Sequence, residues 1–239
     1  MKIGLAQIQS EGNQFNTNLE KHLFFIHKAS IKSVDLVIFP ELSLSAYEPD
    51  LAKGFAQEYS DTYYSIFQDL SSKLGITIIL GAPTQKDNSI CISNLIFLPH
   101  QPARIYSKQM LHQDEEPYFC PGQESNIVEI GNYRIGLAIC YESTQDVHFN
   151  SSIKKGIDLY VVNVVKHLEG MNRAMAVMQK RALEHSLPIL LCNASGYYDG
   201  FKSSGQSAVW DENGRLKGSL SEDEGLLVYD LDSGYIQSH

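Results

Sequence analysis

Apolar and polar positions follow two different periods along this chain. Short apolar runs and strictly alternating stretches predict β-strands, and apolar positions at helical spacing predict α-helices. Strands are predicted at 2–8, 34–40, 76–83, 89–99, 103–108, 158–164, 188–196 and over EGLLVYDLD, and helices at 16–33, about 60–74, about 144–155 and 169–186. Asn16 is the predicted N-cap of the first helix. The alternation of the two kinds of element predicts an α/β fold.

Turn signals connect some of the strands directly to one another. They predict three hairpins, around the turns HQP (100–102), Gly131-Asn132 and Asn213-Gly214. The stretch from Met110 to Asn126 is largely polar and is predicted to be a long loop. A loop of this length inside a compact domain tends to be functional.

Two segments of the chain are similar to each other. SIKSVDLVIF (30–39) and SIKKGIDLYVV (152–162) each combine a helix end with a buried strand. A distant internal duplication explains the similarity, and chance explains a match this short equally well. No linker rich in Pro, Ser or Gly divides the chain, so a single domain over 1–239 is predicted.

Composition and charge exclude several classes of protein. Hydrophobic content of 43% and charged content of 20% are ordinary for a globular protein. The net charge is −9 and the basic residues are scattered, which argues against a nucleic-acid partner. The N-terminal MKIGLAQIQS lacks the apolar core of a signal peptide, and no apolar run approaches the ~18 residues of a membrane span. We therefore expect a cytoplasmic protein with neither a nucleic-acid nor a membrane partner.

The cysteines are widely spaced, and no CxxC pair gives them the spacing of zinc ligands. In a reducing cytoplasm they are expected to be free thiols, so no metal site is predicted. The four are Cys91, Cys120, Cys140 and Cys192.

Three chemically different side chains each follow a predicted strand. Glu41 comes after VIFP, Lys108 closes ARIYSK, and Cys140 ends GLAIC. The carboxyl ends of strands carry the sites of open α/β sheets. Taken alone, each residue has an ordinary explanation: Glu41 as a cap, Lys108 as a solvated lysine, and Cys140 as a small buried apolar residue.

Together these residue types fit one chemistry. A cysteine becomes a good nucleophile when a base removes its proton or a cation stabilises its thiolate. Glu41 would be that base, and Lys108 would stabilise first the thiolate and then the oxyanion of a tetrahedral intermediate. The combination predicts acyl transfer from a cysteine without a histidine.

The motifs around these residues resemble those of a known family. FPELSLSAY, YSKQML, EEPYFCPG and GLAICYES are similar, in order and spacing, to the four motifs of the nitrilase superfamily of carbon-nitrogen hydrolases, in its amidase-like branch. The similarity runs from KIGLAQIQ to GLLVYDLD and includes KRALEHSLPILLCNASG. It implies a four-layer α-β-β-α sandwich with mixed sheets. It also implies a homodimer or larger assembly through the helices near Cys140 and around 170–186.

The resemblance implies a Glu-Lys-Cys triad. Glu41 would act as general base and then as the acid that protonates the leaving amine. Lys108 and the backbone N–H of Tyr141 would bind the oxyanion. Cys140 would attack the carbonyl and form a thioester that water hydrolyses.

The resemblance also implies a second glutamate that positions the lysine and the substrate. Counted back from the Pro-Gly of the third motif, Glu115 matches it, with Glu116 one residue out. Lys166 would hold a substrate carboxylate, or else is an ordinary solvated lysine. The predicted substrate-binding residues are Tyr47, Tyr118, Tyr141, Glu142, Lys166 and His167.

The residues after the nucleophile bear on the substrate. Nitrilases of the family usually have tryptophan and glutamate there, whereas this chain has Tyr141 and Glu142, which favours an amide or carbamoyl substrate over a nitrile. CYESTQDVHF departs from the pattern of many amidases, so an ω-amidase specificity does not transfer directly. The expected function is cysteine-dependent hydrolysis of a small linear amide or N-carbamoyl compound through a thioester, releasing ammonia or an amine, with no cofactor. The alternatives are nitrile hydrolysis, acyl transfer to an amine, and a non-catalytic binding or scaffold protein.

Overall fold

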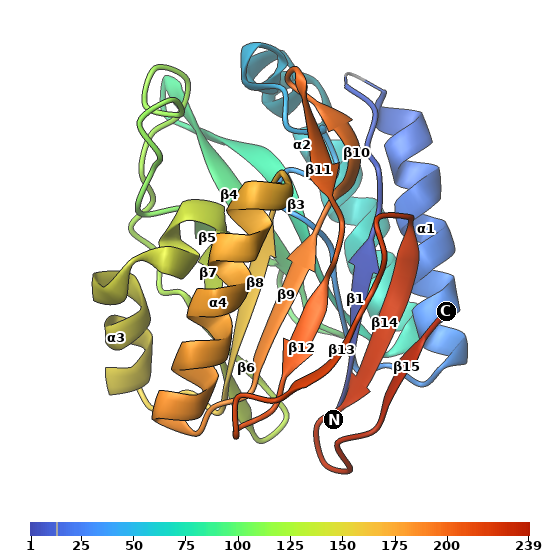
Figure 1. Ribbon diagram of the computed structural model, residues 1–239. Helices are drawn as coiled ribbons and strands as arrows, with labels where there is room; N and C mark the ends of the chain where they lie inside the picture. Colours follow the sequence, from blue (N-terminus) through green and yellow to red (C-terminus); the bar gives the residue numbers. More distant parts are fainter. Residues whose placement is uncertain (13) are drawn as a thin grey trace.

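Two β-sheets face each other, and helices cover both outer faces (Figure 1). The computed structural model describes residues 1–12 and 14–239, with the side chains of 59–62 left aside. The strands of the first sheet are β1 (Lys2–Gln7), β2 (Leu36–Ile38), β3 (Thr77–Lys86), β4 (Ser89–Phe97), β5 (Arg104–Ser107), β14 (Gly225–Asp230) and β15 (Ile236–Ser238). Their spatial order is β15-β14-β1-β2-β3-β4-β5.

The second sheet has the order β13-β12-β9-β8-β7-β6. Its strands are β6 (Ile127–Ile130), β7 (Tyr133–Ile139), β8 (Leu159–Val164), β9 (Ile189–Asn193), β12 (Ala208–Trp210) and β13 (Leu216–Ser219). A separate antiparallel ribbon consists of β10 (Ser195–Tyr198) and β11 (Phe201–Ser204). In each sheet three neighbouring strands run parallel, β1-β2-β3 and β7-β8-β9, with antiparallel strands on either side.

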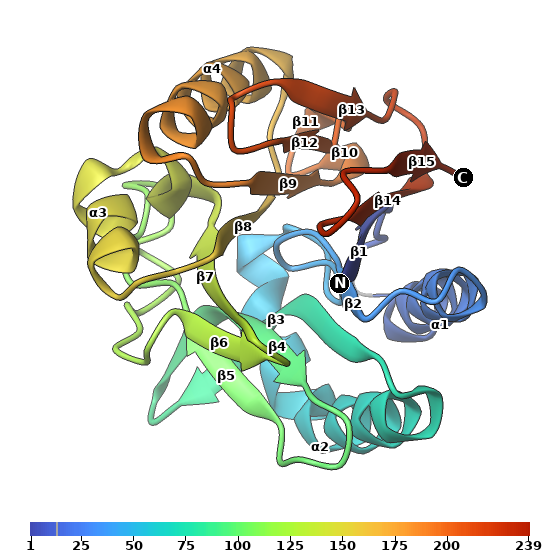
Figure 2. The ribbon, with the colours of Figure 1, turned by 90° about the horizontal axis from the view of Figure 1, so that it is seen from below.

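The helices form the two outer layers (Figure 2). Helices α1 (Phe15–Ile31) and α2 (Pro49–Leu74) pack on the first sheet, and α3 (Asp146–Lys154) and α4 (Leu168–His185) pack on the second. This arrangement confirms the predicted α-β-β-α sandwich. None of the helices among the described residues combines the length and the apolar character that a bilayer crossing needs.

Alternate residues of the central strands face opposite layers, because successive side chains of a strand point to opposite sides. In the first sheet, Ile38 of β2 packs between the two sheets and Val37 packs under the helices. In the second sheet, Val161 of β8 packs between the sheets and Val162 packs against α3 and α4. Both faces of these strands are buried, which explains their continuous apolar sequence.

Most predicted elements are confirmed, and the differences have local reasons. Helix α2 starts at Pro49 and not near residue 60, since its proline occupies the first turn, where no backbone N–H is needed. The N-cap of α1 is Gln14 and not Asn16. The β10–β11 hairpin was missed, although its two-residue turn, Asp199-Gly200 with both φ angles positive, is a strong hairpin signal.

The two similar segments occupy equivalent places in the fold. Strand β2 is the middle of the parallel trio in its sheet and follows α1, while β8 is the middle of the other trio and follows α3. This equivalence agrees with the duplication hypothesis.

Strand direction brings the candidate residues to one end of the sandwich. Strand β5 runs in the direction of β2 and β3, because β4 is antiparallel to both β3 and β5. Glu41 follows β2 and Lys108 follows β5, so both lie at the carboxyl-terminal edge of the first sheet. Cys140 follows β7 at the carboxyl end of the second sheet.

Candidate active site

Lys108 lies between two carboxylates in the interior of the protein. Its Nζ is 2.8 Å from Glu41 Oε1 and 2.6 Å from Glu115 Oε1, and all three side chains are buried. Burial alone would lower the pKa of Lys108, but the neighbouring acidic groups of Glu41, Cys140 and Glu115 outweigh it and raise the pKa above its ordinary value. The lysine therefore carries its positive charge at all physiological pH values.

Glu41 reaches this cluster because the chain crosses tightly over β3. A Cβ atom on Gly81 would lie 2.2 Å from the backbone nitrogen of Leu42 and 2.5 Å from the carbonyl oxygen of Pro40. Only glycine leaves room for the turn that carries Glu41. The other carboxylate oxygen of Glu41 accepts a hydrogen bond from the backbone N–H of Val165, 3.3 Å away, which follows β8 in the opposite sheet.

Cys140 stands at a strained point of the backbone. It has φ of 46° directly after β7 and opens the 3-10 helix Cys140–Thr144. A positive φ is uncommon for a residue other than glycine and is often found where a reactive side chain must be presented. The Cys140 thiol and the Glu41 carboxylate are close enough that each acts on the pKa of the other.

The electrostatics of this pair determine where its proton lies. Burial raises the pKa of the Cys140 thiol to about 11, the charge of Glu41 adds to this rise, and the ammonium groups of Lys166 and Lys108 oppose it. Burial also raises the pKa of Glu41. The Lys108 ammonium opposes this rise, and the charge of Glu115 adds to it. At neutral pH the thiol therefore keeps its proton, next to a carboxylate of increased basicity.

The structure brings Glu115, and not Glu116, to the lysine. Glu115 Oε1 also accepts from the hydroxyl of Tyr47 at 3.1 Å, and Oε2 accepts from the backbone N–H of His112 at 2.7 Å. Glu116 is exposed and lines a different pocket. Glu115 is thus held by three donors while it holds Lys108 in place.

A pocket of about 400 Å³ opens above Cys140. This volume suits a small organic molecule. Four predicted binding residues line it: Tyr47, Tyr141, Lys166 and His167. His167 also caps α4, because its Nδ1 accepts a hydrogen bond from the N–H of Gly170 at 3.3 Å.

Two predicted binding residues lie elsewhere, which corrects their assignment to the pocket. Tyr118 is 42% exposed and lines a neighbouring surface pocket with Asp50. Glu142 is fully buried, since the tight turn after β7 directs its carboxylate back into the sandwich. It accepts hydrogen bonds from the N–H of Ile139 and of Gln109, at 2.8 and 2.5 Å, so it is part of the framework beneath the pocket.

Several residues that line the pocket were not singled out from the sequence. Asp199 and Phe201 belong to the β10–β11 hairpin, and the Asp-Gly turn could have revealed them. Arg173 lies in α4 and bonds Glu169 at 2.5 Å, so it looks from sequence like one half of a surface helical pair. The others are His112 and Asp114, in the long polar loop, with Val165 and Gly170.

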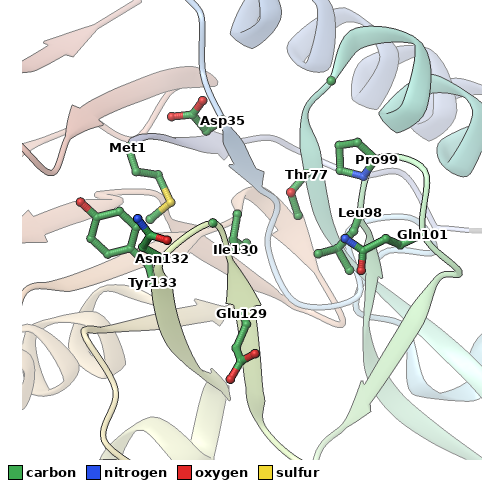
Figure 3. A pocket seen from close by; sticks show the side chains of 12 residues that line it. Met1, Asp35, Thr77, Leu98, Pro99, Gln101, Glu129, Ile130, Asn132 and Tyr133 are labelled. Carbon is green, nitrogen blue, oxygen red and sulfur yellow. The ribbon is translucent and has the colours of Figure 1, made fainter.

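A second pocket lies at the opposite end of the sandwich, beside the starts of β3 and β7 (Figure 3). It measures about 440 Å³ and is lined by residues such as Met1, Asp35 and Tyr133. Among the described residues that line it there is no cysteine, lysine, arginine or histidine side chain. The two pockets are similar in size, but of these two only the one above Cys140 contains a thiol. Over the described part of the chain, no group of three or more His, Cys, Asp or Glu side chains is arranged to hold a metal ion.

Comparison with known proteins agrees with this geometry. The family model for carbon-nitrogen hydrolase matches residues 2–239. The glutamine-dependent NAD(+) synthetase of Thermotoga maritima is 26% identical over 97% of this chain, which spans 42% of that longer protein. The 2-oxoglutaramate amidase of Bacillus subtilis is 24% identical over 96% of this chain and 90% of its own length.

Solved structures share the fold. A mutant of the amidase from Nesterenkonia sp. AN1 in complex with butyramide has a TM-score of 0.90 at 22% identity, over 98% of this chain and 92% of its own. Another mutant of that amidase, with the acetamide moiety of fluoroacetamide covalently added at the active site cysteine, has a TM-score of 0.89 at 22% identity, over 98% of this chain and 93% of its own. With the family match extending over nearly every residue, these findings establish that the chain belongs to the carbon-nitrogen hydrolase family of enzymes.

Proposed function

We propose that the protein hydrolyses the amide bond of a small linear amide through a thioester on Cys140. The observation that carries this proposal is the buried cluster beside the thiol: Lys108 Nζ is 2.8 Å from Glu41 and 2.6 Å from Glu115, and Glu115 and Cys140 line the same open pocket. The amidase from Nesterenkonia sp. AN1, which shares the fold, carries its covalent adduct at a cysteine.

In the first half of the reaction, Glu41 takes the thiol proton while the sulfur attacks the carbonyl carbon. The carbonyl electron pair moves to oxygen, and the oxyanion is bound by Lys108 and the backbone N–H of Tyr141. Lysine has three N–H donors, and two of those on Lys108 are used by Glu41 and Glu115, which leaves one for the substrate. When the oxyanion collapses, the C–N bond breaks and Glu41 gives its proton to the leaving nitrogen.

In the second half, water attacks the thioester. The water oxygen bonds to the acyl carbon while Glu41 takes a proton from that water. The C–S bond breaks, the carboxylic acid leaves, and the sulfur recovers a proton from Glu41. The cycle returns both groups to their starting protonation states, so it needs no cofactor.

The charges of the pocket bear on the substrate. Lys166 and Arg173 line it, and the Lys166 ammonium acts on the pKa of Cys140, so it lies near the reacting centre. We propose that Lys166 binds a carboxylate at the far end of the acyl chain. The 2-oxoglutaramate amidase relative acts, by its name, on an amide that carries such a carboxylate.

Ammonia release from a panel of substrates tests the proposal. The panel contains ω-amides of dicarboxylic acids, matched neutral amides, N-carbamoyl compounds and nitriles. The Cys140→Ala variant is expected to release no ammonia, whereas Cys120→Ala, whose thiol lies outside the pocket, is expected to keep full activity. Activity in Cys140→Ala would refute the mechanism, and hydroxamate formation with added hydroxylamine would measure any acyl transfer.

A separate experiment tests whether Lys166 binds the substrate carboxylate. Lys166→Met is expected to raise KM for an ω-amide about tenfold or more and to leave KM for a neutral amide of equal length within about twofold, since the lost charge–carboxylate bond contributes ~1.5–3 kcal/mol. Equal effects on both substrates would exclude the carboxylate assignment while leaving the amidase proposal intact.

We propose further that the protein forms a homodimer through α3 and α4. Their outer surface exposes Val147 of α3, at 76%, and Leu183 of α4, at 61%. Leu183→Glu is expected to shift the assembly to monomers in analytical ultracentrifugation. Phe24 of α1 is as exposed as Leu183, so Phe24→Glu is the matched control and is expected to leave the assembly unchanged. A monomeric parent protein would contradict this proposal.

A further inference from the structure

Two cysteines outside the pocket contact each other. The Sγ atoms of Cys91 and Cys120 are 2.9 Å apart, although the residues are 29 positions apart in the chain. Both are free thiols. The amidase mechanism uses neither of them.

The pair lies at the base of the loop that carries the catalytic groups. Cys91 is in β4 between Ile90 and Ile92, and both of these neighbours hold the loop by their carbonyl oxygens. The Ile92 carbonyl accepts the N–H of Lys108 at 2.8 Å, and the Ile90 carbonyl accepts the N–H of Cys120 at 2.8 Å. This short piece of β4 therefore anchors the loop at both ends.

Between these two anchors the loop is tied to Glu115. The backbone N–H groups of Tyr118 and Phe119 both donate to the carbonyl oxygen of Glu115, at 3.0 Å each. The N–H of Gly122 donates to the carbonyl oxygen of Lys108 at 2.8 Å, so the returning chain is bonded to its own start. Cys120 is thus joined to Glu115 through a single hydrogen-bonded turn.

We propose that Cys91 and Cys120 form a reversible disulfide that clamps the loop bearing Lys108 and Glu115 onto β4. A disulfide bond is ~2.0 Å long, so the two sulfur atoms need to approach by less than one ångström. In the cytoplasm expected from the sequence the pair is reduced, and it closes when low-molecular-weight disulfides accumulate.

The two thiols take different parts in the exchange. Cys120 is partly exposed and Cys91 is fully buried, and burial raises the pKa of Cys91 to about 12. The Cys120 thiolate attacks one sulfur of the small disulfide RSSR and releases RS⁻. The sulfur of Cys91 then attacks the Cys120 sulfur and expels the second RS⁻. The proton of each protein thiol ends on a released thiol, so one RSSR is reduced to two RSH.

Peptide mapping tests the linkage in the full-length protein. Incubation with glutathione disulfide followed by trypsin, without reduction, is expected to yield peptide 87–104 joined to peptide 109–134. All four cysteines fall on different tryptic peptides, so the pairing is unambiguous. The linked pair should disappear after reduction. Glutathione bound to Cys120 with no linked pair would overturn the proposal.

Thermal unfolding tests the clamp. The oxidised protein is expected to melt roughly 5–10 °C above the reduced protein, because a cross-link over a loop of this length constrains the unfolded chain. The rise should be absent in Cys120→Ser, whose side chain is partly exposed, and present in Cys140→Ala, which cannot react at the active site. A linked pair without a rise, or the same rise in Cys120→Ser, would also overturn the proposal. Neither measurement depends on amidase activity.

Discussion

The carboxylate of Glu142 accepts a 2.5 Å hydrogen bond from the backbone N–H of Gln109, the residue after Lys108. The same carboxylate accepts from the N–H of Ile139, the residue before Cys140, at 2.8 Å. One buried side chain therefore fixes the distance between the two strand ends that present the nucleophile and the lysine. It touches neither substrate nor reacting atoms, so it is a positioning residue.

A chain of hydrogen bonds surrounds the Glu142 carboxylate, which acts as acceptor. The hydroxyl of Tyr106 donates its single proton to Glu142 at 2.7 Å. The neutral His148 ring then carries its hydrogen on Nε2, which donates to the Tyr106 oxygen 2.9 Å away, and its Nδ1 accepts from the hydroxyl of Tyr160 at 3.0 Å. Burial raises the pKa of Glu142, and the donors at Ile139, Tyr106 and Gln109 oppose that rise.

Replacing Glu142 by glutamine tests the positioning role. The amide nitrogen of glutamine would face either the Gln109 or the Ile139 N–H, so one of the two strand ends is released. We expect kcat per folded enzyme to fall about 100-fold, the cost of a small misplacement of reacting groups, with KM within about threefold. The kinetics of Glu142→Gln, measured well below its melting temperature, check this.

The matched control for that variant is Glu116→Gln, an exposed glutamate of the long loop. It is expected to leave both kcat and KM unchanged. If Glu142→Gln merely lowered the melting temperature and kept full kcat, its role would be structural only.

The pH dependence of kcat/KM follows from the Glu41–Cys140 pair. In the proposed mechanism the active form has an ionised Glu41 and a protonated thiol. Activity should therefore rise with pH through the pKa of Glu41, which burial lifts above its usual 4.5. It should fall again only as pH nears the thiol pKa of about 11, since an ionised pair holds no proton for the leaving amine. An acid limb below 4.5, or a decline starting near neutral pH, would contradict this protonation scheme.

The sequence predicted the ends of the strands better than the connections between them. Glu41, Lys108 and Cys140 were singled out because each ends or follows a predicted strand, and the carboxyl ends of strands carry the sites of open α/β sheets. The orientation of Glu142 could not be predicted, since it depends on the 3-10 turn that begins at Cys140. From sequence alone, a glutamate two residues after Cys140 could equally well point into the pocket or into the interior.

Side-chain contacts between the two sheets could not be predicted from the sequence either. Asn94 of β4 and Asn163 of β8 join by two amide hydrogen bonds, 3.0 and 2.5 Å long, in the space between the sheets. Each is a polar residue in a largely apolar strand, and only the stacking of the sheets determines that they meet. The Cys91–Cys120 contact likewise depends on how the long loop returns to β4.

The low pKa values of two buried histidines predict that the protein loses stability in mild acid. Burial lowers the pKa of His22 and of His148 from 6.5 to about 4. Both histidines are therefore neutral in the folded protein and gain a proton on unfolding below pH 6.5. Their contribution to the free energy of unfolding is fully present above pH 6.5 and is lost as the pH falls toward 4. Between pH 7 and 5 each should cost about 2 kcal/mol of the free energy of unfolding.

Urea unfolding measured at several pH values checks this. His22 matters for the active site because its Nε2 bonds the Ser43 hydroxyl at 2.9 Å, in the turn that carries Glu41. His22→Gln is expected to be less stable at pH 7 and to show a shallower pH dependence. An unchanged slope in this variant would mean that His22 is already protonated in the folded protein.

Gly81 gives the sharpest test of how the fold positions Glu41. In Gly81→Ala the new Cβ atom would meet Leu42 and Pro40 backbone atoms at 2.2 and 2.5 Å, so the turn must move away from β3. We expect a loss of about 3 kcal/mol or more in the free energy of unfolding, as for overpacking of a core, together with a fall in kcat. Gly54→Ala is the matched control, because it lies in α2 with no atom within 4 Å of the new Cβ and should stabilise the helix by roughly 0.5–1 kcal/mol. Full stability and activity in Gly81→Ala would show that the crossing over β3 is not what holds Glu41 at Lys108.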